Sequence, residues 1–249
     1  MSVELSADAA WRHLHEEATA PYRKAGSFAW HFARGKLGHD PVFRGLIEQG
    51  LIGAHRRRVV DIGCGQGLFA SLLASMGAMQ SQGGRWPLSW ARTPSAVDYT
   101  GIELMPKDIA RAQQSVGHLQ PVPRFVCADM RTAGLPDCDL VVILDVLHYV
   151  DHAAQEAVLR RVRDALAPSG RLLLRIGDVD DRRGFAISQW VDRMVTRIRG
   201  HRVSPTWGRP LKDWIALLQR LGFTVRSVPM SEGTPFANVL LVADLTPTS

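Results

Sequence analysis

Short, continuously apolar runs alternate with longer amphipathic segments over residues 57–178. The apolar runs have the length of β-strands, and the amphipathic segments repeat their apolar residues with a helical period. Strands without polar alternation are typical of a parallel sheet covered by helices on both faces. The expected strands lie at 58–64, 97–104, 124–130, 139–147 and 170–178, and the expected helices at 67–78, 106–119 and 151–167.

The last quarter of the chain follows a different order. Amphipathic helices are expected near 185–198 and 210–222, ahead of strands at 223–230 and 236–245. The turn-rich SEGTP sequence between these strands indicates a hairpin, so the sheet ends in an antiparallel pair. The whole pattern predicts an α/β fold: a doubly wound, mostly parallel sheet of seven strands with an antiparallel last strand.

The residues ahead of the first strand are expected to be helical. One of these helices has Asp40 as its N-cap and Pro41 at its first helical position. We therefore divide the chain into an N-terminal helical cap, residues 1–55, and a main domain, residues 56–249. The long connection at 80–96 is expected to be a surface elaboration without a catalytic role.

Composition limits the classes of protein to which this chain can belong. Its 249 residues, 46% of them hydrophobic, can bury a large core. The sequence contains no run of 18 apolar residues, which a membrane-spanning helix would need. The N-terminus carries acids and histidines among its apolar residues, unlike a signal peptide. Three cysteines without metal-ligand spacing indicate neither a disulfide framework nor a metal site, so we expect a cytoplasmic protein.

The chain is basic, with a formal net charge of +6 and a pI of about 9.7. Such a balance is compatible with an RNA partner or an acidic protein partner. The excess comes mostly from scattered arginines rather than from one block. We therefore do not expect nucleic acid as a partner, and RNA binding remains the alternative.

The sequence VVDIGCGQGLFA joins an apolar strand to an apolar helix through Gly63, Gly65 and Gly67. Glycines permit positive φ and let a ligand approach the backbone, and the following helix presents free N–H groups at its N-terminus. The dinucleotide pattern GxGxxG differs, because here the third glycine comes one residue early. The turn predicts a nucleotide-like ligand, and the alternative is a tight turn without a ligand.

Acidic residues end the next three expected strands: Glu103 the second, Asp129 the third and Asp145 the fourth. Doubly wound sheets bind their ligands at the carboxyl ends of their strands. A carboxylate there accepts hydrogen bonds from ribose hydroxyls or from an exocyclic amine. We expect these acids to bind one adenosine-containing ligand that has no phosphate to repel them.

Taken in order, these motifs resemble those of class I S-adenosylmethionine-dependent methyltransferases, which have a Rossmann-like fold. VVDIGCGQG is similar to the first motif of that family, GIEL to the second, CADM to the third and DLVVILDVLHYV to the fourth. The resemblance covers residues 57–178 and implies S-adenosyl-L-methionine as the cofactor. Methyl transfer from this donor needs mainly positioning and desolvation, with a base only where the acceptor must lose a proton.

The resemblance also implies roles for particular residues. The glycine turn would hold the methionine part of the cofactor, with Asp61 orienting the turn. Glu103 would bind the ribose and Leu104 would pack on the adenine, while Asp129 would accept from the adenine amine beside the Met130 backbone. The implied cofactor-binding residues are Asp61, Gly63, Gly65, Gly67, Glu103, Leu104, Asp129, Met130 and Asp145.

The sequence after the fourth strand bears on the acceptor. It contains no NPPY or DPPY motif of adenine-N6 or glutamine-amide methyltransferases, and no Pro-Cys pair of cytosine enzymes. DVLHYV instead resembles the corresponding segment of small-molecule methyltransferases. His148 is the candidate catalytic base or substrate hydrogen-bonding group, and the alternative is that it packs against or caps the next helix. Asp145 would reach the methionine ammonium or solvate the loop.

Substrate contacts are expected from segments outside these motifs. Residues 179–210 lie where this family often builds a substrate lid, and they include His201, Trp207 and Arg209 as candidate lining residues. His31, in an aromatic and basic stretch of the N-terminal cap, is a further candidate. A solvated helix face is the alternative explanation for His31.

The sequences GKLGHDPVFRGLIEQGLI and PMSEGTPFANVLLVA also resemble methyltransferases that accompany aryl-polyene pigment biosynthesis, a branch of secondary metabolism. That resemblance implies an aromatic acceptor or one bound to an acyl carrier protein, whose acidity would suit a basic surface. We expect methyl transfer to a small-molecule substrate, at an aromatic hydroxyl or an activated ring carbon. The alternatives are an RNA methyltransferase and a catalytically silent subunit that binds cofactor or a partner chain.

Overall fold

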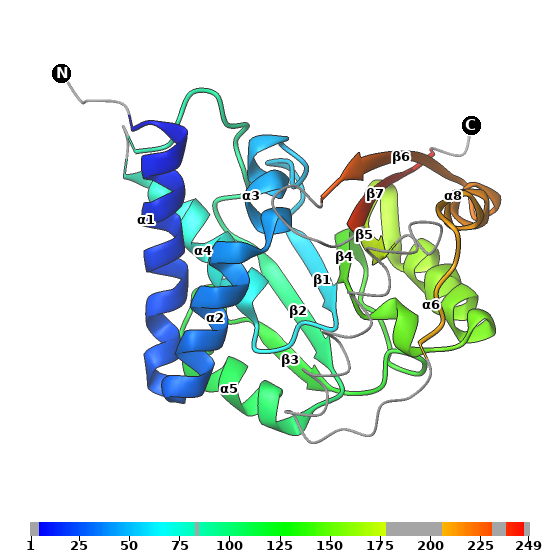
Figure 1. The fold of residues 1–249 in the computed structure, drawn as a ribbon, viewed down its shortest axis with the longest axis horizontal. Coiled ribbons are helices and arrows are strands. Elements are labelled where there is room, and N and C mark those ends of the chain that lie inside the picture. The colour runs from blue at the N-terminus through cyan, green and yellow to red at the C-terminus, as the bar shows by residue number, and fades with distance from the viewer. Residues whose placement is uncertain (1–4, 83–84, 178–205, 231–237, 247–249) are drawn as a thin grey trace. The chain divides into compact units, whose positions relative to one another are not determined.

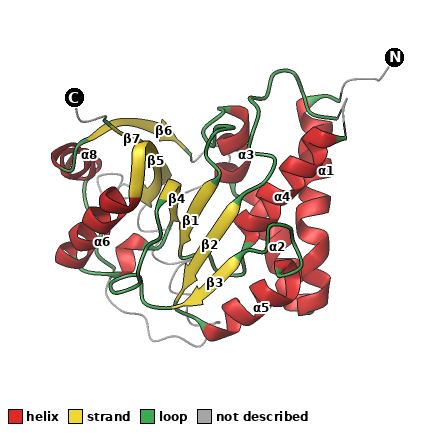
Figure 2. Ribbon diagram, turned by 180° about the vertical axis from the view of Figure 1, so that it is seen from behind, coloured by secondary structure: helices red, strands yellow, loops and turns green. Residues whose placement is uncertain are grey.

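The computed structural model describes residues 5–82, 85–177, 206–230 and 238–246. Its strands form a seven-stranded sheet of order β3-β2-β1-β4-β5-β7-β6, flanked by helices (Figures 1 and 2). This order and the antiparallel final strands confirm the predicted α/β fold. By its internal contacts the chain divides into two compact units, Met1–Leu140 and Val141–Ser249. Among the described residues, no helix has the length and apolar character needed to cross a membrane.

The first unit carries the N-terminal helices, the first three strands and the helices that connect them. β1, β2 and β3 are parallel, with Ile62 opposite Ile102 and Glu103 opposite Cys127. The elements are α1 (Ala7–Thr19), η1 (Ala20–Ala25), α2 (Ser27–His39), α3 (Pro41–Glu48), β1 (Arg58–Ile62), α4 (Leu68–Ser81), β2 (Asp98–Glu103), α5 (Pro106–Val116) and β3 (Arg124–Cys127).

The N-terminal helices pack against the helices that connect the strands of this unit. α1 lies along α4, and η1 packs against α5 (Figure 1). The Ser71 hydroxyl on α4 donates to the Ala18 carbonyl oxygen at 2.7 Å, and both residues are buried. Asp40 caps α3 as predicted, because its carboxylate accepts the Val42 N–H at 3.1 Å. The predicted domain boundary after residue 55 stays a prediction.

The described part of the connection at 80–96 is held together by contacts between its own residues. The Gln80 side chain accepts the Thr93 N–H at 3.0 Å. Trp90 is buried, and the indole N–H of Trp86 donates to the Trp90 carbonyl oxygen at 3.2 Å. The two indole rings meet edge to face, 5.2 Å apart. The segment is therefore held by its own polar and aromatic side chains.

A buried hydrogen bond links β1 to β2. The Tyr99 hydroxyl donates to Asp61 Oδ2 at 2.6 Å, and Asp61 is only 5% exposed. Burial raises the pKa of Asp61 from 3.8 to about 7, because it disfavours the charged carboxylate. The Tyr99 hydrogen bond opposes this rise and the charge of Glu103 adds to it.

The second unit carries the end of β4 and the remaining strands. β7 runs antiparallel to both β5 and β6, with Leu241 opposite Leu174 on one side and Ser227 on the other. The helix expected near 185–198 lies outside the described residues. The elements are β4 (Cys138–Leu144), η2 (Leu147–Tyr149), α6 (His152–Ala165), β5 (Leu166–Gly177), α8 (Leu211–Arg220), β6 (Phe223–Pro229) and β7 (Asn238–Leu245).

A fully buried amide, that of Gln155 on α6, ties the segment before α8 to the rest of this unit. Its Nε2 donates to the carbonyl oxygens of Val150 at 3.0 Å and Trp207 at 2.7 Å. Its Oε1 accepts from Arg209 Nε at 2.7 Å. One side chain thus satisfies three polar groups, two of which belong to the 206–210 segment.

The Gln155→Leu variant should lose about 2–3 kcal/mol of unfolding free energy, because two carbonyl groups and a guanidinium lose their shared partner. Urea denaturation measures the loss. Gln219→Leu on α8 is the matched control, because Gln219 is exposed and should change stability by less than about 0.5 kcal/mol. Equal, small losses in both variants would contradict the role of Gln155.

Asp61 makes the stability of the fold depend on pH. Between about pH 4 and pH 7 the folded chain keeps a proton on Asp61 that the unfolded chain has released, because the folded pKa is about 7. Stability from this group therefore falls as pH rises through that interval, by up to about 1.4 kcal/mol per pH unit, and is constant above it.

The comparison that isolates this effect is wild type against Asp61→Asn, measured by urea denaturation from pH 4.5 to 8.5. The other titratable groups are the same in both proteins, so their contributions cancel in the difference. We expect the variant to gain stability relative to wild type as pH rises to about 7. A difference that does not change with pH would show that Asp61 is ionised in the fold.

Candidate functional site

The glycine-rich turn between β1 and α4 has an open side and a packed side. Gly63, Gly65 and Gly67 have φ of 78°, 53° and 73°, in the left-handed region that favours glycine. A Cβ atom on Gly67 would lie 2.8 Å from the ring of Phe125. A Cβ atom on Gly65 would meet no atom of the described residues within 4 Å. Packing therefore requires Gly67, whereas Gly65 leaves room for a ligand over the backbone.

Glu103 joins the end of β2 to this turn. Its carboxylate accepts the Gly65 N–H at 3.1 Å and the Met105 N–H at 2.9 Å. The side chain of the next residue, Leu104, is 60% exposed. An open glycine, a carboxylate and an exposed apolar side chain therefore occur together where β2 ends.

Asp129, after β3, is held by a neighbouring arginine. Its carboxylate accepts the backbone N–H of Arg131 at 2.8 Å and the guanidinium of the same residue at 2.6 Å. The Asp129 carbonyl oxygen accepts the Ala133 N–H at 2.8 Å, which closes the turn that contains Met130. Sequence reasoning overlooked Arg131, although its place two residues after the acid is visible in the sequence.

The N-terminal segment also reaches the glycine turn. Tyr22 of η1 is 0% exposed, and its hydroxyl donates to the Gln66 carbonyl oxygen at 3.0 Å. Burial is the main reason that the pKa of Tyr22 is well above its ordinary value, and the nearby Cys64 and Asp61 add to the rise. Sequence reasoning gave Tyr22 no role, because no local pattern distinguishes it from other aromatic residues in its segment.

In the second unit, the residue after β4 forms an ion pair with a buried arginine. Asp145 has φ of 60°, which non-glycine residues seldom adopt. Its Oδ1 accepts from Arg175 Nε at 2.7 Å, and its Oδ2 accepts from the Nη2 of the same guanidinium. Arg175 is 2% exposed, so removing Asp145 would leave a buried charge. Sequence reasoning overlooked Arg175, although an arginine inside an apolar strand was the signal.

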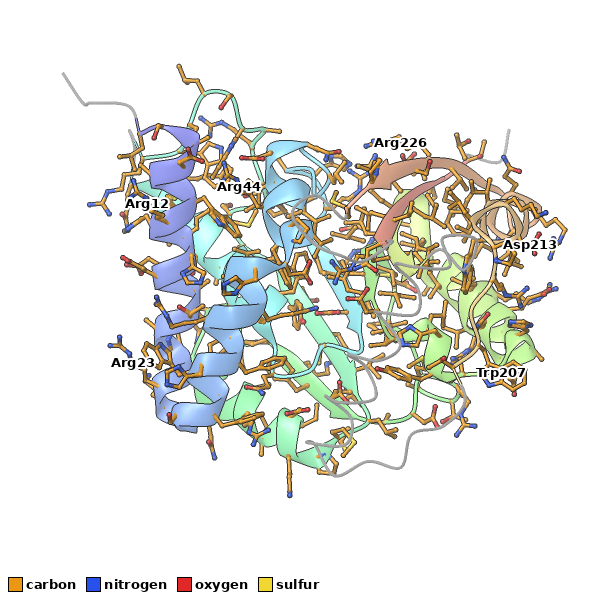
Figure 3. All side chains as sticks on the ribbon, viewed as in Figure 1. Arg12, Arg23, Arg44, Trp207, Asp213 and Arg226 are labelled. Carbon is orange, nitrogen blue, oxygen red and sulfur yellow. The ribbon has the colours of Figure 1, made fainter. Side chains whose placement is uncertain are left out.

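The structure places His148, Trp207 and Arg209 in the second unit. The carbonyl oxygen of His148, on η2, accepts the Trp207 N–H at 2.8 Å. Trp207 is 42% exposed and lies at the surface near α6 (Figure 3). Arg209 donates to the Gln155 side chain at 2.7 Å, and its guanidinium lies 5.5 Å from the centre of the Trp214 ring.

The other predicted substrate residues are placed differently. His31 lies on α2 of the first unit, where it is exposed and its ring centre is 4.7 Å from that of Trp30. His201 lies outside the described residues, as does most of the predicted lid at 179–210. The substrate roles of His31, His201, Trp207 and Arg209 stay predictions.

The chain is similar in sequence to curated proteins of two kinds. A carboxy-S-adenosyl-L-methionine synthase from Chromohalobacter salexigens is 32% identical over 124 residues, which cover 49% of this chain and 39% of that protein. A tetracenomycin polyketide synthesis 8-O-methyl transferase from Streptomyces glaucescens is 32% identical over 113 residues, which cover 43% of this chain and 31% of that protein. The match thus spans less than two fifths of either relative.

A solved structure with a similar fold is that of magnesium protoporphyrin IX methyltransferase from Synechocystis PCC 6803 with bound SAH. The TM-score is 0.57 at 18% sequence identity, and the match covers 94% of this chain and 98% of that one. The model of a family described as a methyltransferase domain matches residues 11–228, which include the glycine turn and every described residue of the candidate site. The predicted resemblance to the methyltransferases of aryl-polyene biosynthesis stays a prediction. The family match confirms the resemblance to methyltransferases in general: the chain belongs to the methyltransferase domain family.

Proposed function

We propose that this protein transfers a methyl group from S-adenosyl-L-methionine to a small molecule. One observation carries the proposal: the Glu103 carboxylate accepts the Gly65 N–H at 3.1 Å, so an acid at the end of β2 adjoins an open glycine turn after β1. The similarity to carboxy-S-adenosyl-L-methionine synthase and the fold shared with an SAH-bound methyltransferase support the same cofactor.

The residues around this hydrogen bond fit the parts of that cofactor. The open backbone at Gly65 would lie beside the methionine part, and Glu103 would accept from the ribose hydroxyls. The exposed Leu104 side chain would pack on the adenine, with Asp129 and Met130 at its edge. The bound cofactor supplies a methyl group already activated by the sulfonium charge, so the chain's own residues have to bind, orient and exclude water.

For the acceptor we propose an aromatic hydroxyl or an activated ring carbon, either free or attached to a carrier protein. The similarity to an 8-O-methyl transferase of polyketide synthesis supports this class. His148 would take the proton from the acceptor hydroxyl, and the exposed Trp207 would contact the aromatic ring. Arg209, His31 and His201 remain the further candidates for substrate contact.

The charge distribution favours a small acceptor over RNA. An RNA-binding face needs cations that are available to phosphates. Many described arginines instead have a carboxylate within 4.0 Å, which reduces the positive potential around them. The arginines paired in this way include Arg44, Arg58, Arg111, Arg131, Arg160, Arg163 and Arg171.

Isothermal titration with S-adenosyl-L-methionine tests the cofactor assignment. Glu103→Ala should weaken binding by about 10- to 100-fold, because the cofactor loses a charged hydrogen-bond acceptor and the turn loses its tie to β2. His148→Ala should change the affinity by less than about twofold, because its role concerns the acceptor. Failure of the folded wild type to bind would overturn the proposed function, and equal losses in the two variants would contradict the separate roles.

The role of His148 is tested with phenolic acceptors, offered free and on a carrier protein, and a labelled methyl donor. His148→Ala should lower kcat by about 100-fold or more with the KM for the donor unchanged, because proton removal from the hydroxyl loses its base. His118→Ala, an exposed histidine of the first unit, is the control and should keep full activity. Unchanged turnover of phenols by His148→Ala would assign His148 a structural role.

A further inference from the structure

We infer that Tyr22 positions the glycine turn for the cofactor, so that the N-terminal segment is a working part of the binding site. This inference rests on the proposed function. Tyr22 is 0% exposed, and its hydroxyl donates to the Gln66 carbonyl oxygen at 3.0 Å. Gln66 lies between Gly65 and Gly67, and its carbonyl belongs to the same peptide unit as the Gly67 N–H, which donates to the Cys64 carbonyl oxygen at 2.9 Å.

The side chains of the turn give the backbone at Gln66 little support of their own. Its glycines have more backbone freedom than any other residue type, and Glu103 restrains the Gly65 N–H. The Gln66 side chain adds no restraint of this kind, because both of its amide atoms are buried without a hydrogen bond to any described residue. The bond from Tyr22 therefore ties the Gln66–Gly67 peptide unit to the N-terminal segment, whereas the bond from the Gly67 N–H to Cys64 lies within the turn.

Tyr22 is presented from a firmly held segment. Just before η1, the Thr19 hydroxyl donates to the His15 carbonyl oxygen at 2.7 Å, which holds the end of α1. η1 itself packs against α1, α2 and α5. A hydroxyl on a segment held in this way stays in one position, so its hydrogen bond restricts the conformation of the turn.

Loss of the Tyr22 hydroxyl would let the turn occupy conformations that do not accept the cofactor. The measured dissociation constant rises by the factor by which the competent conformation is depopulated. Tyr22 acts through Gln66, so the rate of the chemical step is unaffected once the cofactor is bound. The expected signature is a raised KM for the methyl donor at constant kcat.

The experiment compares Tyr22→Phe with Ser71→Ala in the full chain. Each variant removes one hydroxyl that ties the N-terminal segment to the strand–turn–helix region, and each leaves one buried carbonyl oxygen without that donor. Only the Gln66 carbonyl, which loses its donor in Tyr22→Phe, belongs to the glycine turn. Calorimetry with S-adenosyl-L-methionine should give a dissociation constant raised about 3- to 10-fold for Tyr22→Phe and by less than twofold for Ser71→Ala, with similar losses of Tm.

Equal effects of the two variants on affinity would overturn the inference, as would unchanged binding by Tyr22→Phe. A wild type that fails to bind would instead overturn the proposed function, so the two failures are distinguishable. If Tyr22→Phe is unfolded without cofactor, the concentration of S-adenosyl-L-methionine that restores the fold is measured instead. Because binding stabilises the folded state, this concentration gives the dissociation constant of the variant. A constant equal to that of wild type would again overturn the inference.

Discussion

The Glu103 carboxylate is hydrogen-bonded to the N–H groups of Gly65 and Met105, one in the turn after β1 and one in the turn after β2. The parallel register makes this contact possible, because Ile62 lies opposite Ile102 and so both turns begin at the same level of the sheet. Ionised carboxylates make stronger hydrogen bonds than neutral groups. One acid thus orders the backbone on which a cofactor would lie and presents its remaining acceptor capacity to that ligand.

Other buried polar groups extend this order away from the site. The Tyr22 hydroxyl donates to the Gln66 carbonyl oxygen in the glycine turn, and the Tyr99 hydroxyl donates to the Asp61 carboxylate just before the turn. Each partner comes from a different part of the first unit, so the shape of the turn depends on packing that reaches back to α1. In the second unit the Arg175–Asp145 pair restrains the residue after β4 in the same manner. Because Arg175 is buried, loss of the Asp145 carboxylate would destabilise this unit.

Much of the fold follows from local pattern, because the apolar runs and the glycine spacing are properties of short segments. The strands β1 to β7 and the Asp40 cap were predictable in this way. The partners Tyr22 and Arg175 were not, because their hydrogen bonds join residues 44 and 30 positions apart, and no periodicity reports such contacts. The helix predicted to reach residue 167 ends at Ala165, because the chain enters β5 at Leu166.

Hydrogen–deuterium exchange of the full chain, with and without S-adenosylhomocysteine, tests directly whether the turn at 63–67 and the residues 103–105 form the methyl-donor site with η1 as their support. Addition of the ligand should slow exchange in both of these segments and in residues 20–25. Protection confined to other segments, with these three unchanged, would contradict this assignment of the site.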